Sequence, residues 1–244
     1  MIPILFLLFA GSITCTSCEK EEFPITSGNL QIEVVAGENW LHDYPLFLGL
    51  SKENPPQFAI WIEDTLENYV TTVYVTKKIA TEGWVSNKGN RRKEALPYWC
   101  HQRGVVYRDG LMLPTKENPM PDAVTGATPK SSRTFATQTD RLKAPFVIKA
   151  EFNHSVDFNK SFPKNAKKGD GNYSGGSEGS GQPAIIYAGT IYPNQTTIEL
   201  KLIGRSSADG SDGNIYTDLE KLTTARNIVQ SITCQIVEKS SLAH

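Results

Sequence analysis

Two neighbouring runs of the sequence decide the fold, Phe58-Ala-Ile-Trp-Ile-Glu63 and Tyr69-Val-Thr-Thr-Val-Tyr-Val-Thr76. The first run largely alternates apolar residues with polar or small ones, which is the period of a half-buried strand. The second run is rich in β-branched and aromatic residues, which favour strands. The polar segment 64–68 between them has the composition of a turn. Together the two runs predict a β-hairpin.

Five further runs have the character of strands and extend this pattern along the chain. They cover residues 30–35, 145–152, 184–190, 197–203 and 228–237. Because helical periodicity is almost absent, the chain is expected to be all-β, as an antiparallel β-sandwich of immunoglobulin-like topology with long loop insertions. The one short helix expected is 218–225, with Thr217 or Asp218 as its cap.

The chain begins with an apolar run from Ile2 to Ala10, followed by small and hydroxyl residues. Such a run suits the hydrophobic segment of a signal peptide, and it is too short to span a bilayer core of ~30 Å. The small residues at 16 and 17 favour cleavage before Cys18 over cleavage before Cys15, where Thr14 is a poorer neighbour. A buried N-terminal strand or helix is the alternative.

This N-terminal segment resembles the lipoprotein signals of Bacteroidetes-type bacteria, in which an acidic stretch such as residues 19–22 often follows the lipid-carrying cysteine. The resemblance implies a signal peptide at 1–17, lipidation of Cys18 and a tether at 18–28. It also implies an exported protein that is anchored in the outer membrane and faces the periplasm or the cell surface. The strand pattern predicts that residues 29–240 form a single β-sandwich domain.

The charge, the cysteine content and the absence of known motifs exclude several classes of function. The net charge of -1 provides no basic field to attract nucleic acid. Cys100 and Cys234 remain beyond the signal peptide, and the sequence allows either a disulfide between them or two buried free thiols. No zinc-ligand spacing, nucleophile elbow or phosphate-binding loop is present, so we predict no metal site, no catalytic residues and no stand-alone enzyme.

Two long loops interrupt the strands. Residues 164–181 are nearly all Lys, Asp, Ser, Asn and Gly, and this composition predicts a mobile surface excursion. Residues 77–144 have little regular pattern. Because a compact domain seldom carries so much irregular chain without a use for it, we expect the functional residues in this second loop.

The sharpest motif of the chain is Asp122-Ala-Val-Thr-Gly-Ala-Thr128. It resembles the acceptor sequence of proteins that carry FMN covalently, such as the flavin subunits of the Rnf and Nqr electron-transfer complexes. The resemblance implies that an exported flavin transferase joins the phosphate of FMN to the hydroxyl of Thr128. The site residues implied in this way are Asp122, Thr125, Gly126, Ala127 and Thr128.

Physically, this linkage needs an exposed hydroxyl on an open turn, and Gly126 and Ala127 leave such a turn accessible. The cofactor would supply redox chemistry, while the protein supplied position and electrostatics. The alternative interpretation is a glycine-containing turn that leads into the Ser/Thr-rich loop 131–134.

A second resemblance covers about residues 30–240. The strand 56–64, the strand 69–78, Trp84, the stretch 91–99 and the motif 122–128 occur in the order typical of the predicted periplasmic family called domain of unknown function 2271. This resemblance implies an extracytoplasmic setting close to flavin transferases and membrane redox systems. It implies no catalytic residues.

A basic stretch surrounds Pro97-Tyr-Trp99 within the 77–144 loop region. Its cations are suited to clamping a phosphate or carboxylate, while an aromatic ring stacks on a planar ligand such as isoalloxazine. The ligand-binding candidates are Arg91, Arg92, Tyr98, Trp99, His101 and Arg103. The alternative is a solvated charged loop around a core tryptophan.

Two functions follow from these observations. The first is a lipid-anchored module that carries covalent FMN at Thr128, with a flavin transferase and a redox protein as partners. The second is a non-enzymatic binding or structural module whose 77–144 loop region contacts a protein, a glycan or an anionic ligand.

Overall fold

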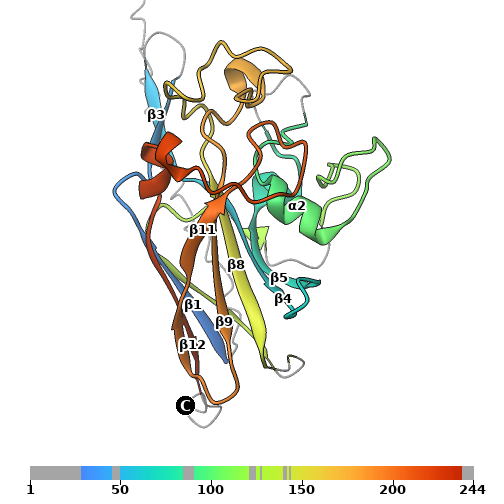
Figure 1. The fold of residues 1–244 in the computed structure, drawn as a ribbon, viewed down its shortest axis with the longest axis vertical. Coiled ribbons are helices and arrows are strands. Elements are labelled where there is room, and N and C mark those ends of the chain that lie inside the picture. The colour runs from blue at the N-terminus through green and yellow to red at the C-terminus, as the bar shows by residue number, and fades with distance from the viewer. Residues whose placement is uncertain are drawn as a thin grey trace, which may run out of the picture.

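A computed structural model describes residues 29–45, 50–84, 91–120, 125–126, 128–139, 142 and 144–237. Two β-sheets pack face to face, and a short ribbon and long loops gather at one end of them (Figure 1). The predicted all-β antiparallel sandwich is therefore confirmed, while its immunoglobulin-like topology stays a prediction. The signal peptide 1–17, Cys18 and the tether 18–28 lie outside the described residues.

The four-stranded sheet has one buried face. Its strands, in spatial order, are β10 (Thr197–Glu199), β12 (Val229–Ile236), β1 (Leu30–Ala36) and β7 (Arg133–Thr137), all antiparallel. Along β1, Leu30, Ile32 and Val34 are buried while Glu33 is exposed. This alternation is the sequence signature of a strand with one face toward a core.

The six-stranded sheet is formed by β11 (Lys201–Arg205), β9 (Ile185–Ile191), β8 (Phe146–Asn153), β4 (Gln57–Glu63), β5 (Tyr69–Thr76) and β6 (Thr125–Gly126). Its neighbours are antiparallel except β5 and β6. The predicted hairpin is β4–β5, and its turn is fixed by Asp64, whose carboxylate accepts the backbone N–H groups of Leu66 and Asn68.

The six-stranded sheet is buried on both faces. Phe58, Ile60 and Ile62 of β4 enter the sandwich core between the two sheets, where Phe58 stacks on Phe152 with ring centroids 4.9 Å apart. The opposite face of β4 packs into a second apolar group, which we call the outer cluster. Its largest fully buried members are Trp61, Trp99, Ile79, Leu96 and Ile186.

The loop regions supply the cover over the outer face. Helix α1 (Lys77–Ala80) continues directly from β5, and helix α2 (Pro97–Arg103) lies against the six-stranded sheet (Figure 1). The ribbon of β2 (His42–Pro45) and β3 (Ser51–Asn54) was not expected from the sequence. None of the described helices is long and apolar enough to cross a membrane.

Three segments differ from the sequence-based expectation. The run 197–203 divides between the two sheets as β10 and β11, with Leu200 at the crossing. The expected helix 218–225 is wrong: the chain forms two 3-10 turns, η3 (Leu219–Lys221) and η4 (Thr224–Asn227), because the Asp218 carboxylate pairs with Arg205 at 2.7 Å instead of capping.

The third segment is the Gly/Ser-rich excursion 164–181, which contributes buried polar groups to the domain. Ser174 and Ser180 are buried, and the Ser180 hydroxyl donates to the Asn153 Oδ1 at 2.7 Å. Gly175 has φ +93, a left-handed conformation that favours glycine. Hydrogen bonds, and not apolar area, therefore hold this part of the loop.

The two cysteines of the described domain are free and buried. Cys100 belongs to the outer cluster and Cys234 to the sandwich core, so the six-stranded sheet separates them. Of the two alternatives that the sequence allows, the structure has the free thiols.

We predict that Ile148→Ala destabilises the protein by about 2–5 kcal/mol, because the fully buried Ile148 side chain fills the sandwich core. Val70→Ala on the same sheet is the control. Since Val70 is 47% exposed, its loss should change the free energy of unfolding by less than about 0.5 kcal/mol. Urea unfolding followed by tryptophan fluorescence measures both; equal effects would contradict the burial of Ile148 in the sandwich core.

We also predict that Cys100 and Cys234 resist alkylation in the native protein at pH 8. Burial raises the pKa of both thiols, that of Cys234 to about 12. Unfolding without reductant should make both residues react, as peptide mapping by mass spectrometry would detect. If both stayed unmodified after unfolding, they would be joined by a disulfide.

Candidate functional site

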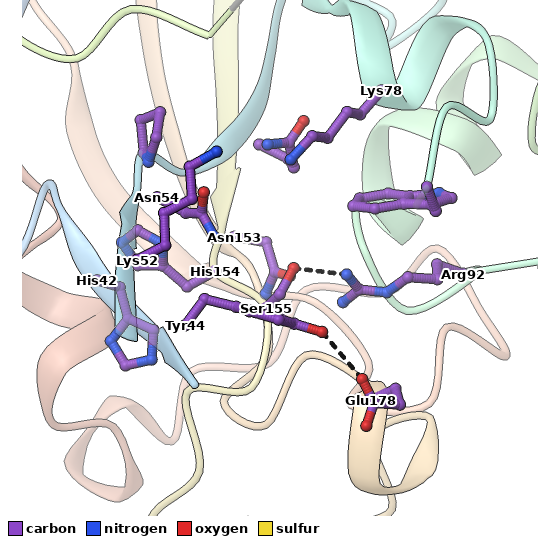
Figure 2. Close-up of a pocket in the computed structure, with 13 residues that line it drawn as sticks. His42, Tyr44, Lys52, Asn54, Lys78, Arg92, Asn153, His154, Ser155 and Glu178 are labelled. Carbon is purple, nitrogen blue, oxygen red and sulfur yellow. Dashed lines mark hydrogen bonds between the residues drawn. The ribbon is translucent and has the colours of Figure 1, made fainter. Parts of the chain in front are cut away.

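A pocket of about 230 Å³ opens between the β2–β3 ribbon, the start of β4, helix α1 and the end of β8 (Figure 2). We call it the basic pocket. It is lined by His42, Tyr44, Lys52, Asn54, Pro55, Gln57, Lys78, Trp84, Arg92, Asn153, His154, Ser155 and Glu178. Segments far apart in the sequence meet here, because the pocket lies where the sandwich ends and the loops begin.

Positive charge gathers in the basic pocket without matching counter-ions. Lys52 and Lys78 extend toward each other from opposite sides, and Arg92 approaches from a third direction (Figure 2). Burial, and next the charges of Lys52 and Arg92, lower the pKa of Lys78. No ion pair joins Lys52 or Lys78 to the described residues. Such a site attracts an anion.

Arg92 is fixed by its surroundings. Its guanidinium donates to the hydroxyl oxygens of Ser155 at 2.5 Å and Ser180 at 3.1 Å. It also pairs with Glu94 at 3.2 Å and lies 4.4 Å from the ring centroid of Trp84. The charge of Arg92 is thus partly compensated by Glu94, which leaves the two lysines as the uncompensated cations of the pocket.

Thr128 of the DAVTGAT motif does not line the basic pocket itself but contacts Gln57, which does. The Gln57 amide nitrogen lies 3.4 Å from the Thr128 Oγ1, and the Thr128 side chain is partly exposed. Gln57 is only 5% exposed, and its Oε1 has no hydrogen-bond partner among the described residues. A polar ligand group at this position would satisfy that buried oxygen.

Hydrogen bonds hold the chain on both sides of Thr128. The Tyr74 hydroxyl donates to the Gly126 carbonyl at 3.3 Å, and the Trp40 indole N–H donates to the Pro129 carbonyl at 3.0 Å. Thr125 and Gly126 form strand β6 beside the end of β5. Of the other motif residues, Asp122 and Ala127 lie outside the described residues.

The structure buries both aromatic rings of the predicted basic-aromatic site. Tyr98 is 3% exposed and Trp99 is 0% exposed, because α2 presses both rings onto the outer face of the six-stranded sheet. The Tyr98 hydroxyl oxygen accepts from the Lys149 ammonium at 2.5 Å, and the Trp99 indole N–H donates to Thr72 at 3.0 Å. Neither ring is available to stack on a ligand.

The cations of that predicted site are dispersed. Arg91 pairs with Glu82 at 3.0 Å and with Asp109, while the Arg103 guanidinium lies over the Trp99 ring at 4.8 Å. His101 lines a different small pocket. Only Arg92 of the six candidates lines the basic pocket.

Sequence reasoning missed Lys52, Gln57 and Lys78 as pocket residues. Lys78 lies two residues after the second strand of the predicted hairpin, and Gln57 directly precedes the first one. Both residues therefore lie at the same end of that hairpin, and this proximity could have been predicted from the sequence. The position of Lys52 could not be predicted in this way, because Lys52 lies on β3, a strand that was not expected from the sequence.

A buried carboxyl holds α2 in place. Glu151 on β8 accepts the backbone N–H groups of Tyr98 at 3.2 Å and Trp99 at 2.7 Å. Burial raises the pKa of Glu151 to about 8. Within the described ranges, no group of three His, Cys, Asp or Glu side chains is placed to hold a metal ion.

Comparisons of the chain with family models, with curated proteins and with solved structures return no match.

We predict that Glu151→Gln flattens the pH dependence of stability between about pH 4.5 and 8. Because the folded state raises this pKa, it binds a proton that the unfolded chain has released, so the stabilisation is complete below pH 4.5 and is lost as the pH approaches 8. The slope approaches about 1.4 kcal/mol per pH unit.

Buried His154 acts in the opposite direction at lower pH, because burial lowers its pKa to about 4. The quantity to measure is therefore the difference in unfolding free energy between the wild type and Glu151→Gln, by urea titration at several pH values. A difference that did not change with pH would contradict the raised pKa of Glu151.

Proposed function

We propose that this protein is a lipid-anchored extracytoplasmic β-sandwich that carries FMN covalently on Thr128. The observation that carries the proposal is that the hydroxyl of Thr128, in a motif resembling flavin-acceptor sites, lies 3.4 Å from a glutamine that lines the basic pocket. A modified threonine at this point would place its phosphate beside a cationic cavity.

The residues present fit the phosphate end of FMN. A phosphodiester is negatively charged, and Lys52 and Lys78 are the uncompensated cations nearby. The buried Oε1 of Gln57 can accept a hydrogen bond from a ribityl hydroxyl. When bound, FMN would supply one- or two-electron transfer.

The basic pocket is too small to enclose a whole FMN molecule. Its volume of about 230 Å³ is below the roughly 300–1,000 Å³ of pockets that enclose a whole drug-sized ligand. Lys52, Lys78 and Gln57 would therefore hold the phosphate end of FMN, and the pocket would not enclose the whole cofactor.

Loading requires a flavin transferase and a flavin dinucleotide as donor. The oxygen of Thr128 would form the new bond to the FMN phosphorus, and the P–O bond of the pyrophosphate would break. The nucleoside monophosphate would leave, and the threonine proton would pass to a base of the transferase.

The start of β1 and the basic pocket lie at opposite ends of the sandwich. Leu30 pairs with Ile236 near the C-terminal end, whereas the β2–β3 ribbon that lines the pocket is at the other end (Figure 1). A tether at residues 19–28 would span at most about 35 Å when extended, so lipidation at Cys18 would keep the domain close to the membrane.

We predict that co-expression with an exported flavin transferase adds the mass of one esterified FMN to the mature chain. Thr128→Ala should abolish this addition, because it removes the acceptor oxygen. Ser131→Ala, which removes an exposed hydroxyl from the same loop, is the matched control and should load normally. Intact-mass spectrometry measures all three. Unmodified wild type, or a mass increase that survives Thr128→Ala, would refute the proposal.

A further inference from the structure

We infer that the basic pocket is a binding site for a phosphate-type anion in its own right, and that it is functional when Thr128 is unmodified. Its ligand class is a small phosphate monoester, bound through Lys52, Lys78 and Arg92. This inference goes beyond covalent attachment and does not depend on it.

The basic pocket has an excess of positive charge. Lys52, Lys78 and Arg92 line it, and Arg92 pairs with Glu94 at 3.2 Å, so the two lysines face one carboxylate, Glu178, and a net positive charge remains. Glu178 accepts the Tyr44 hydroxyl at 2.9 Å on the side away from the lysines (Figure 2). An anion between the lysines would balance the remaining charge.

The ammonium group of Lys78 has lost part of its hydration. Lys78 is partly buried, and its low pKa reflects a charge that has lost water and faces two other cations. Holding an ammonium group there costs free energy in the absence of a partner. An anion placed between Lys52 and Lys78 replaces the lost hydration and relieves the repulsion.

The basic pocket also supplies hydrogen-bond donors for an anion. Ser155 accepts from Arg92 through its oxygen, so its own O–H proton is available to a ligand. Arg92 is immobilised by Ser155, Ser180 and Glu94, and its position needs little reordering when an anion binds. Two mobile ammonium groups and one fixed guanidinium are a donor set suited to phosphate.

The volume of the basic pocket limits the size of the ligand. About 230 Å³ accepts a phosphate group with a short stem, while a bulky substituent must extend into solvent. The pocket therefore selects the phosphate and is indifferent to most of what it is attached to. FMN is one such monoester, and inorganic phosphate is the smallest probe of the same chemistry.

The test uses the wild-type chain from cells without a flavin transferase, titrated with inorganic phosphate by isothermal calorimetry at constant ionic strength. We expect binding, and we expect Lys52→Met and Lys78→Met each to weaken it about tenfold or more. Lys201→Met is the matched control, because Lys201 is 71% exposed on β11 and does not line the pocket. It should leave the affinity unchanged.

Both pocket substitutions should fold. Lys52 is exposed, and Lys78→Met removes a poorly solvated charge while keeping an unbranched side chain only one atom shorter. A second arm compares FMN with riboflavin, which lacks the phosphate: FMN should displace inorganic phosphate, and riboflavin should not. Absence of phosphate binding, affinities unchanged by both lysine variants, or equal competition by riboflavin would each overturn the inference.

The two proposals fail separately. Phosphate binding without any FMN mass increase on co-expression would leave this inference standing and remove the covalent carrier. If FMN is attached to Thr128 but the unmodified chain does not bind phosphate, the covalent carrier stands and the phosphate-binding site is refuted.

Discussion

The rest of the structure depends on the burial of the six-stranded sheet on both faces. In β4 every residue is buried, with Phe58, Ile60 and Ile62 toward the sandwich core and Trp61 toward the outer cluster. A sandwich sheet normally leaves one face to water, so this one needs a second cover. At about 25 cal/mol per Å² of apolar surface, covering the outer face is a large stabilising term. The loop region between β5 and β7 supplies much of that cover.

That burial creates a second requirement, because the outer face also carries charged side chains. Lys149 pairs with Glu63 at 2.7 Å, and the Trp61 indole N–H donates to the same carboxylate at 2.6 Å. Glu151 instead takes the first N–H groups of α2. Buried polar groups are tolerated when they are paired in this way. The helix that looked like a ligand-binding loop in the sequence is therefore a structural cover, and its aromatic rings serve packing.

The basic pocket lies at the edge of this cover. There the β2–β3 ribbon, the start of α1 and Arg92 meet. Arg92 pairs with Glu94, whereas the ammonium groups of Lys52 and Lys78 form no ion pair with the described residues. The buried Lys149, by contrast, pairs with Glu63. This contrast distinguishes a site for a ligand from a structural ion pair, and Thr128 lies at that site through Gln57.

The sequence by itself determined the strands β1, β4, β5, β8, β9 and β12, the β4–β5 hairpin and the DAVTGAT motif, because alternation, β-branching and turn composition are local properties. It also identified Arg92, though among neighbours that have other roles. It did not predict β2, β3, β6 or β7. Only the tertiary structure decided that Tyr98 and Trp99 are core residues, that the run 197–203 changes sheets at Leu200, and that Cys100 and Cys234 lie on opposite sides of one sheet. The physical reason is that these facts depend on which face of a sheet a distant loop covers, and local composition carries no record of that choice. The meeting of Thr128, Gln57, Lys52 and Lys78 is of the same kind.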